Sequence, residues 1–110
     1  MDVEQIRDYC LQKENTTESF PFGGETLVFK SSDKIFLLLA LDAEELRFNV
    51  KCNPEKAIEL REQYPEYVLP GYHMNKKHWN TIIPKYLKPL LVKEMINDSY
   101  NLVTQKNKRV

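Results

Sequence analysis

The stretch GYHMNKKHWN, residues 71 to 80, holds the side chains of this sequence that are best suited to chemistry or binding. His73 and His78 are possible metal ligands, but a structural zinc site needs four ligands and a catalytic one usually three. Their spacing of five residues matches neither a helical i, i+4 pair nor a Cys-x-x-Cys knuckle. We therefore expect no metal and no cofactor. A small-molecule site or enzyme around Tyr72, His73 and His78 is the least favoured alternative.

Other residues that could act as nucleophiles lack the context that activates them. Cys10 and Cys52 are far apart and fall on the apolar faces of their expected elements, where thiols stay protonated and inert. We interpret both as reduced core thiols. Ser99 has no nucleophile elbow around it. The Gly23-Gly24 pair does not lead into a helix, so a phosphate loop is missing. No enzymatic activity is predicted.

Basic and aromatic residues alternate downstream of residue 71. Five basic side chains occur within thirteen residues that contain no acidic residue, and three aromatic side chains are interleaved with them. Lysines attract phosphates without regard to sequence, and aromatic faces contact bases. The competing interpretation is structural, because tryptophan often anchors a core and lysines protect an edge strand from aggregation. The residues concerned are Lys76, Lys77, His78, Lys85 and Lys88, with Tyr72, Trp79 and Tyr86.

Charge is distributed unevenly along the chain although the formal net charge is zero. Residues 1 to 66 contain 8 Lys or Arg and 14 Asp or Glu, a balance of −6, while residues 67 to 110 contain 8 Lys or Arg and 2 acidic residues, a balance of +6. Such asymmetry between halves points to contact with nucleic acid or an acidic partner.

Hydrophobic periodicity predicts one α+β domain, residues 1–110, with antiparallel strands and the helices packed on one face of the sheet. LRFNVKC alternates cleanly, which predicts a strand with one solvent-facing side. Asn53-Pro54 is typical of a helix start. In chain order we expect a helix at 3–13, strands at 26–30, 34–41 and 46–52, a helix from 54 to 64, two short strands around NKK, and a helix from residue 89, with residues 105–110 fraying as a basic tail.

The length and composition limit the cellular context. A chain of 110 residues with 42% hydrophobic residues has the material for a single core. Its longest apolar run, Ile35 to Leu41, is far shorter than the ~20 residues of a membrane span. The start MDVEQIRDYC is acidic where a signal peptide would be basic and then apolar. We therefore expect a cytoplasmic protein with no membrane contact.

Three segments, CNPEKAIELREQYP, PGYHMNKKHWNTI and EMINDSYNLV, resemble the MmcQ/YjbR family of small bacterial proteins, and the resemblance runs over nearly the whole chain. The family is similar in fold to CyaY-like and secretion-chaperone-like α+β domains. It is labelled DNA-binding by structural inference, so the resemblance implies a fold and a DNA-binding hypothesis, with no catalytic residues to carry over.

We predict a module that binds DNA or RNA through a basic sheet face and the turn at residues 75–80. If the strand HWNTII pairs beside LRFNVKC, Arg47 and Lys51 join His78 and Asn80 on one solvent-facing side. The alternative is a protein-interaction or chaperone-like adaptor whose sheet or aromatic patch binds a protein partner. The oligomeric state stays open. The predicted binding residues are Arg47, Lys51, Asn75, Lys76, Lys77, His78, Asn80, Lys85 and Lys88.

Overall fold

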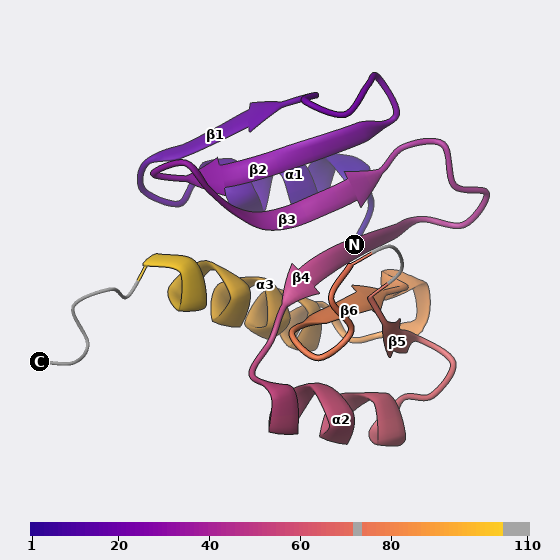
Figure 1. Cartoon of the computed structure of the whole chain (residues 1–110). Coiled ribbons are helices and arrows are strands. Elements are labelled where there is room, and N and C mark those ends of the chain that lie inside the picture. The colour runs from indigo at the N-terminus through magenta and orange to yellow at the C-terminus, as the bar shows by residue number, and fades with distance from the viewer. Residues whose placement is uncertain (72–73, 105–110) are drawn as a thin grey trace, which may run out of the picture.

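The computed structural model describes residues 1–71 and 74–104 of the chain, and the predicted α+β class is confirmed (Figure 1). The predicted tail at 105–110 lies outside the described residues, as do Tyr72 and His73. In chain order the elements are α1 (Val3–Leu11), β1 (Thr16–Ser19), β2 (Thr26–Ser31), β3 (Lys34–Ala40), β4 (Arg47–Lys51), α2 (Pro54–Gln63), β5 (Val68–Pro70), β6 (Trp79–Ile82), the 3-10 helix η1 (Pro84–Tyr86) and α3 (Pro89–Thr104).

The strands form one antiparallel sheet in the order β1-β2-β3-β4-β6-β5. The sequence predicts three strands before the second helix, but the structure has four. The additional strand β1 has the sequence TTES and lies at the edge of the sheet. It carries no apolar residue, so hydrophobic alternation could not reveal it. β3 occupies a central position, as its continuous apolar sequence predicts.

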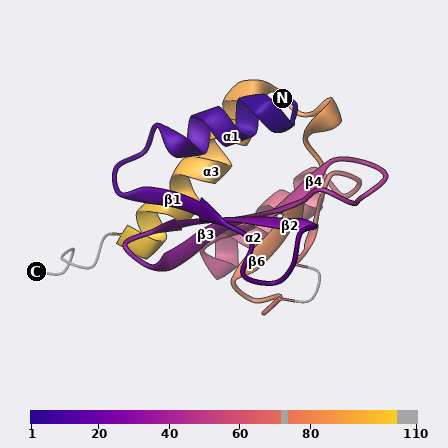
Figure 2. The same ribbon diagram turned by 90° about the horizontal axis from the view of Figure 1, so that it is seen from above.

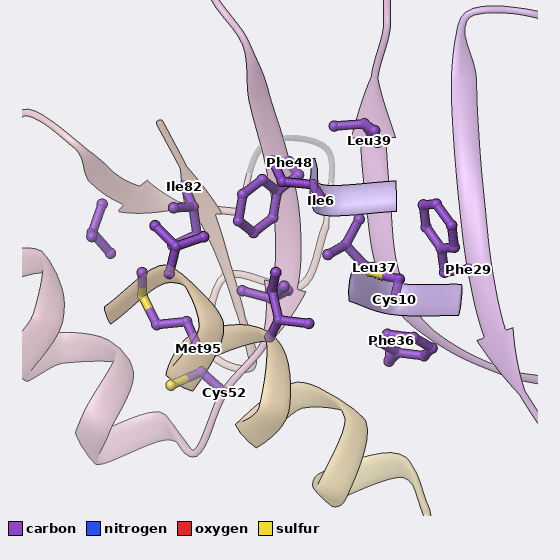
Figure 3. Packing of buried hydrophobic residues seen from close by; sticks show 14 of the residues in the cluster. Ile6, Cys10, Phe29, Phe36, Leu37, Leu39, Phe48, Cys52, Ile82 and Met95 are labelled. Atoms are coloured by element: carbon purple, nitrogen blue, oxygen red, sulfur yellow. The ribbon is translucent and has the colours of Figure 1, made fainter. Parts of the chain in front are cut away.

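One face of the sheet is covered by the helices, and the core lies between them. Figure 2 shows α1 and α3 above the sheet, and residues of α2 join the same buried cluster. The close view in Figure 3 shows how aromatic and aliphatic side chains of the strands meet α1 and α3. The cluster includes Ile6 and Cys10 of α1, Ala57 and Leu60 of α2, Val92, Met95 and Ile96 of α3, and Leu37, Leu39, Phe48, Val50 and Ile82 of the sheet.

The helix starts follow the capping residues that the sequence offers. The side chain of Asp2 accepts a hydrogen bond from the backbone N–H of Gln5, and the Gln5 side chain accepts one from the N–H of Asp2, which completes a capping box. Asn53 caps α2, because its Oδ1 accepts from the N–H of Glu55 at 2.9 Å. α1 ends at Leu11, two residues before the predicted end.

A β-bulge between β2 and β3 determines which side chains at this end of the two strands face away from the helices. Phe29 lies opposite Leu37, yet the next residue, Lys30, lies opposite Ile35, so Phe36 is an extra residue on β3. Phe36 is buried, and its ring lies 6.5 Å from that of Phe29. After the bulge, Ile35 and Lys30 face away from the helices.

Candidate functional site

The strand pairing defines a second sheet face, which we call the open face because no helix covers it. Residues directly opposite each other on antiparallel strands project to the same side. Phe48 and Val50 are buried under the helices, so their neighbours on β4 face the other way. Asn49 lies opposite Thr81, and Lys51 lies opposite Trp79. The open face is therefore formed by Arg47, Asn49 and Lys51 of β4, Trp79 and Thr81 of β6, Ile35, Leu38 and Ala40 of β3, and Thr26 and Lys30 of β2.

The predicted grouping of Arg47 and Lys51 with Asn80 on one solvent-facing side is wrong. Asn80 lies opposite Val50, on the helix side of the sheet, and is only 1% exposed. Its Oδ1 accepts a hydrogen bond from Nε of Arg61 at 2.8 Å, and its Nδ2 donates to the carbonyl of Ala57. The register of β6 against β4 differs by one residue from the register that this grouping requires, and a shift of one residue exchanges the two faces of a strand.

Two lysines and a tryptophan gather at one end of the open face. Lys30 projects beside Ile35, and Lys51 projects beside Trp79 on the neighbouring pair of strands. We call this group, Lys30, Ile35, Lys51 and Trp79, the lysine rung. Lys30 was missed by sequence reasoning, although it ends the alternating segment Thr26 to Lys30. The bulge that brings it next to Ile35 leaves no sequence signal.

Trp79 is half-buried and is not part of the hydrophobic core. The backbone of Gly71 packs closely against Trp79. A Cβ atom at position 71 would lie 2.7 Å from the Cβ of Trp79 and 2.8 Å from the carbonyl oxygen of Trp79. Only glycine permits this approach, in which the N–H of Gly71 donates to the carbonyl of Trp79. The backbone at the tryptophan is thus fixed on one side by β5, and the residue stays at the surface beside Lys51.

The turn before β6 presents two exposed lysines, Lys76 and Lys77. Asn75 organises it: its side chain accepts from the N–H of Lys77 at 2.9 Å, and its carbonyl accepts from the N–H groups of His78 and Trp79. Nη2 of Arg61 also donates to the carbonyl of Lys76. Because Arg61 holds both Lys76 and the buried Asn80, it joins α2 to this turn. His78 is half-buried, and its carbonyl accepts from the N–H of Cys52 at 2.7 Å.

The remaining predicted cations lie at the opposite end of β4 and β6. Arg47 is four residues from Lys51 along one strand, about 13 Å. Nε of Arg47 donates to the carbonyl of Glu45. Lys85 lines a surface hollow with Asp2, Glu44 and Glu45, and Lys88 is exposed just before α3. The structure therefore groups Lys51 with Asn75, Lys76, Lys77 and His78, and separates Arg47, Lys85 and Lys88 from them.

The four lysines at this end have no carboxylate partner among the described residues. The ion pairs within residues 1–71 and 74–104 are Arg7 with Glu18 at 2.6 Å and Lys56 with Asp98 at 3.9 Å. The acidic first half of the chain thus leaves Lys30, Lys51, Lys76 and Lys77 available to an external anion.

The two thiols are buried, as the sequence predicts. Burial raises the pKa of Cys10 to about 12, and burial likewise raises the pKa of Cys52. In the described part of the chain, no three His, Cys, Asp or Glu side chains come together as metal ligands, while His73 lies outside it. Among the same residues, no helix combines the length and apolar character needed to cross a bilayer.

Comparison with known proteins identifies relatives over most of the chain. The sequence model of the YjbR family matches residues 11–102. The uncharacterized protein YbdF of Escherichia coli O157:H7 is 44% identical over 89 residues, which make up 76% of this chain and 69% of YbdF. The uncharacterized protein YjbR of Escherichia coli K12 is 28% identical over 82 residues, 74% of this chain and 69% of that protein.

Two crystal structures share the fold. A Deinococcus radiodurans protein with a DUF419 domain superposes with a TM-score of 0.88 at 38% identity, over 94% of this chain and 79% of that one. A Pseudomonas syringae protein superposes with a TM-score of 0.76 at 28% identity, over 93% of this chain and 98% of that one. The similarity therefore extends over nearly all of the sheet and its helices.

Proposed function

The chain belongs to the YjbR family, and we propose that it binds single-stranded nucleic acid at the lysine-bearing end of its open face. In this proposal Lys30, Lys51, Lys76 and Lys77 hold phosphates, and Trp79 stacks on a base. The observation that carries it is the direct pairing of Lys51 with Trp79, which presents a cation and an aromatic ring on the same side of adjacent strands.

Electrostatics supports a polyanion as the ligand. Lys51 is half-buried on the open face, and the turn lysines Lys76 and Lys77 are exposed three and two residues before Trp79. None of these amines is neutralised by a carboxylate of the described residues. Unpaired lysines at one end of a surface concentrate positive potential there, and neutralising phosphates with them releases counterions, which favours binding.

The shape of the site favours a single strand over a duplex. The lysine rung crosses from β2 to β6, three strand spacings or about 14 Å, and lies on a sheet surface with no projecting helix. Reading a duplex commonly requires an element that enters the major groove. A single strand instead lies along a cationic track and stacks its bases on aromatic side chains. The rung offers both features, with Trp79 as its aromatic member.

The test is a titration with fluorescein-labelled oligo-dT of about 16 nucleotides at low salt. Trp79 is the chain's only tryptophan, so its emission reports the site directly. We expect increased anisotropy of the oligonucleotide together with quenching of Trp79. The double variant Lys76→Ala/Lys77→Ala should bind at least about tenfold more weakly, since two phosphate contacts are lost.

The matched control is Lys85→Ala/Lys88→Ala, which removes the same charge from exposed positions at the other end of β6. It should bind within about twofold of the unmodified protein. Equal weakening by both double variants would mean that only net charge matters and that the proposed site is wrong. Absence of any binding at low salt would reject the function itself.

A further inference from the structure

The other end of the open face carries a groove with different chemistry. It encloses about 830 Å³ and is formed by strand residues on its floor and by two loops and Met74 at its sides. One loop, residues 20–25, joins β1 to β2, and the other, residues 41–46, joins β3 to β4. We call it the loop-end groove. Its lining includes Phe22, Ile35, Leu38, Ala40, Asn49 and Met74.

Most of the floor and one side of the groove are apolar, although Thr26, Asn49 and Thr81 also line the floor. Leu38 lies on the floor with 9% of its surface exposed, although it faces away from the helices. Phe22 forms part of the wall and is 66% exposed, so its ring has little contact with the rest of the protein. Phe20 and Leu41, in or beside the same loops, are also exposed. Apolar side chains gathered on one exposed surface are typical of an interaction site.

The side of the groove formed by the loop between β3 and β4 is acidic. The loop between β3 and β4 contributes Asp42, Glu44 and Glu45, and all three are exposed. None of them belongs to an ion pair of the described residues. Arg47 is the one basic residue among the lining residues that the structure describes, so three carboxylates face one guanidinium. An occupant of the groove must therefore tolerate negative potential, which excludes the nucleic acid proposed for the lysine rung.

We infer that the loop-end groove binds a basic amphipathic helix of a protein partner. The apolar side of the helix rests on Leu38, Ile35 and Phe22, and its lysines or arginines face Asp42, Glu44 and Glu45. Charge complementarity selects the basic partner. The apolar part of the floor, Ile35, Leu38 and Ala40, favours a helix over an extended chain. These side chains offer no hydrogen-bonding groups to an extended backbone, whereas a helix bonds its own N–H and C=O groups.

The site shares Ile35 with the lysine rung but differs from it in charge, and its acidic loop lies at the other end of β4. The carboxylates follow β3 and precede Arg47, while Lys51 ends β4. The two ends of the strand are about 13 Å apart. Substitutions in the loop at 41–46 thus address this inference alone, and substitutions in the turn at 75–77 address the nucleic-acid proposal alone.

The experiment uses the full chain and a labelled model peptide of about 18 leucines and lysines arranged as an amphipathic helix. Two comparison peptides are a Leu/Glu version and a Leu/Lys peptide of scrambled order. Anisotropy should rise for the amphipathic Leu/Lys peptide, with Kd at least about tenfold lower than for either comparison peptide. Circular dichroism of the mixture should show increased helix content on binding.

Two variants locate the site. Glu44→Lys/Glu45→Lys should weaken binding of the Leu/Lys peptide by about tenfold or more, because the groove then repels its lysines. The same variant should improve binding of the Leu/Glu peptide, whose carboxylates it attracts. Phe22→Ser should weaken binding of the Leu/Lys peptide by about tenfold, since an exposed ring is lost without disturbing the core. The matched control, Glu59→Lys/Glu62→Lys, makes the same charge change at exposed positions of α2 and should leave Kd within about twofold.

Three results overturn the inference: no binding of the Leu/Lys peptide, equal binding of the scrambled peptide, or equal weakening by the α2 control variant. Concentration-dependent dimers that are abolished by Phe22→Ser would also overturn it, because a second copy of the chain would then be the occupant. Binding of oligo-dT is measured on the same samples. If it persists while the peptide fails to bind, the groove inference fails and the proposed function stands.

Discussion

The hydroxyl of Ser99 on α3 takes the place of a strand-to-strand hydrogen bond by accepting from the backbone N–H of Lys51 at 2.8 Å. The same hydroxyl donates to the carbonyl of Phe36, the extra residue of the bulge on β3. The register of β3 and β4 ends at Leu37 and Val50, one residue before this point. Ser99 is fully buried. One helix side chain thus satisfies two backbone groups and holds Lys51, a member of the lysine rung.

Replacing Ser99 by alanine should therefore be costly. Ser99→Ala removes the partner of the part-buried N–H of Lys51 and of the buried carbonyl of Phe36, and an unsatisfied buried polar group costs about 1 to 3 kcal/mol. We expect the free energy of unfolding to fall by about 2 to 4 kcal/mol in urea denaturation. Ser19→Ala, at an exposed edge position, is the control and should change it by less than about 0.5 kcal/mol. A similarly small change for Ser99→Ala would contradict the bridging role.

The pair formed by Arg61 and Asn80 should be energetically coupled. Arg61 donates from Nε to the buried Asn80 oxygen at 2.8 Å, and a hydrogen bond to a charged group contributes about 1.5 to 3 kcal/mol. A double-mutant cycle with Arg61→Met and Asn80→Ala should give a coupling energy of at least about 1 kcal/mol. Additivity within about 0.3 kcal/mol would show that the bond contributes nothing to stability. Arg61→Met should also weaken oligo-dT binding, because the turn at Lys76 loses its anchor on α2.

The salt dependence of oligo-dT binding should reveal how many lysines act. If Lys30, Lys51, Lys76 and Lys77 each neutralise one phosphate of a single strand, log K should fall with log salt at a slope of about −2.8. Lys30→Ala should reduce the magnitude of that slope by about 0.7. The slope of Lys88→Ala should stay unchanged. A slope near zero would indicate that phosphates are not the ligand of these lysines.

Acid should weaken the attachment of the edge strand β1. The hydrogen bond from Arg7 lowers the pKa of Glu18. Burial raises this pKa by a smaller amount, and the positive charge of Arg7 lowers it further. Because the folded pKa lies below the unfolded value of about 4.3, the stabilisation is present above that pH and is lost as pH falls through the folded pKa. Glu18→Gln should therefore differ from the unmodified protein at neutral pH and converge with it in acid.

The measurement is urea unfolding of both proteins between about pH 7 and pH 3. Thr17→Ala, also on β1 but with an exposed side chain, leaves the Arg7–Glu18 pair intact and should keep the original pH dependence. A stability difference between Glu18→Gln and the unmodified protein that is independent of pH would show that the ion pair does not titrate in this range.

Both cysteines should resist thiol reagents in the native state. Burial raises the pKa of Cys10 to about 12 and also raises that of Cys52, so very little reactive thiolate is present at neutral pH. Reaction with a disulfide reagent should be slow in buffer and fast in urea. Cys52 should react before Cys10, because it is 7% exposed at the end of β4 whereas Cys10 is fully buried. Rapid native labelling of Cys10 would contradict the packing of α1 on the sheet.

Local sequence patterns predicted most helices and strands, whereas the pairing of distant strands determines which residues share the open face. The alternation in LRFNVKC correctly assigned Phe48 and Val50 to the core, and Asn53-Pro54 marked the start of α2. These signals act over a few residues, where sequence order and spatial order coincide. The register between β4 and β6 connects residues about thirty positions apart, and a shift of one residue moved Asn80 into the core.

Two further features had no local signal. The bulge at Phe36 brings Lys30 beside Ile35, and it depends on how two strands pair rather than on the composition of either. β1 is polar and belongs to the sheet through its ladder with β2 and the bond from Arg7 to Glu18. The turn lysines Lys76 and Lys77 were proposed as binding residues because an uninterrupted basic and aromatic stretch is visible in the sequence itself.

The open face is electrostatically asymmetric, with lysines at one end and carboxylates at the other. In the two binding proposals, a phosphate chain and a basic helix that approach from solution would be attracted to different ends, so that each encounter complex would form already oriented. Between the two ends lies only the length of β4. If both proposals hold, the two ligands would contact each other, and binding of one should change the affinity for the other.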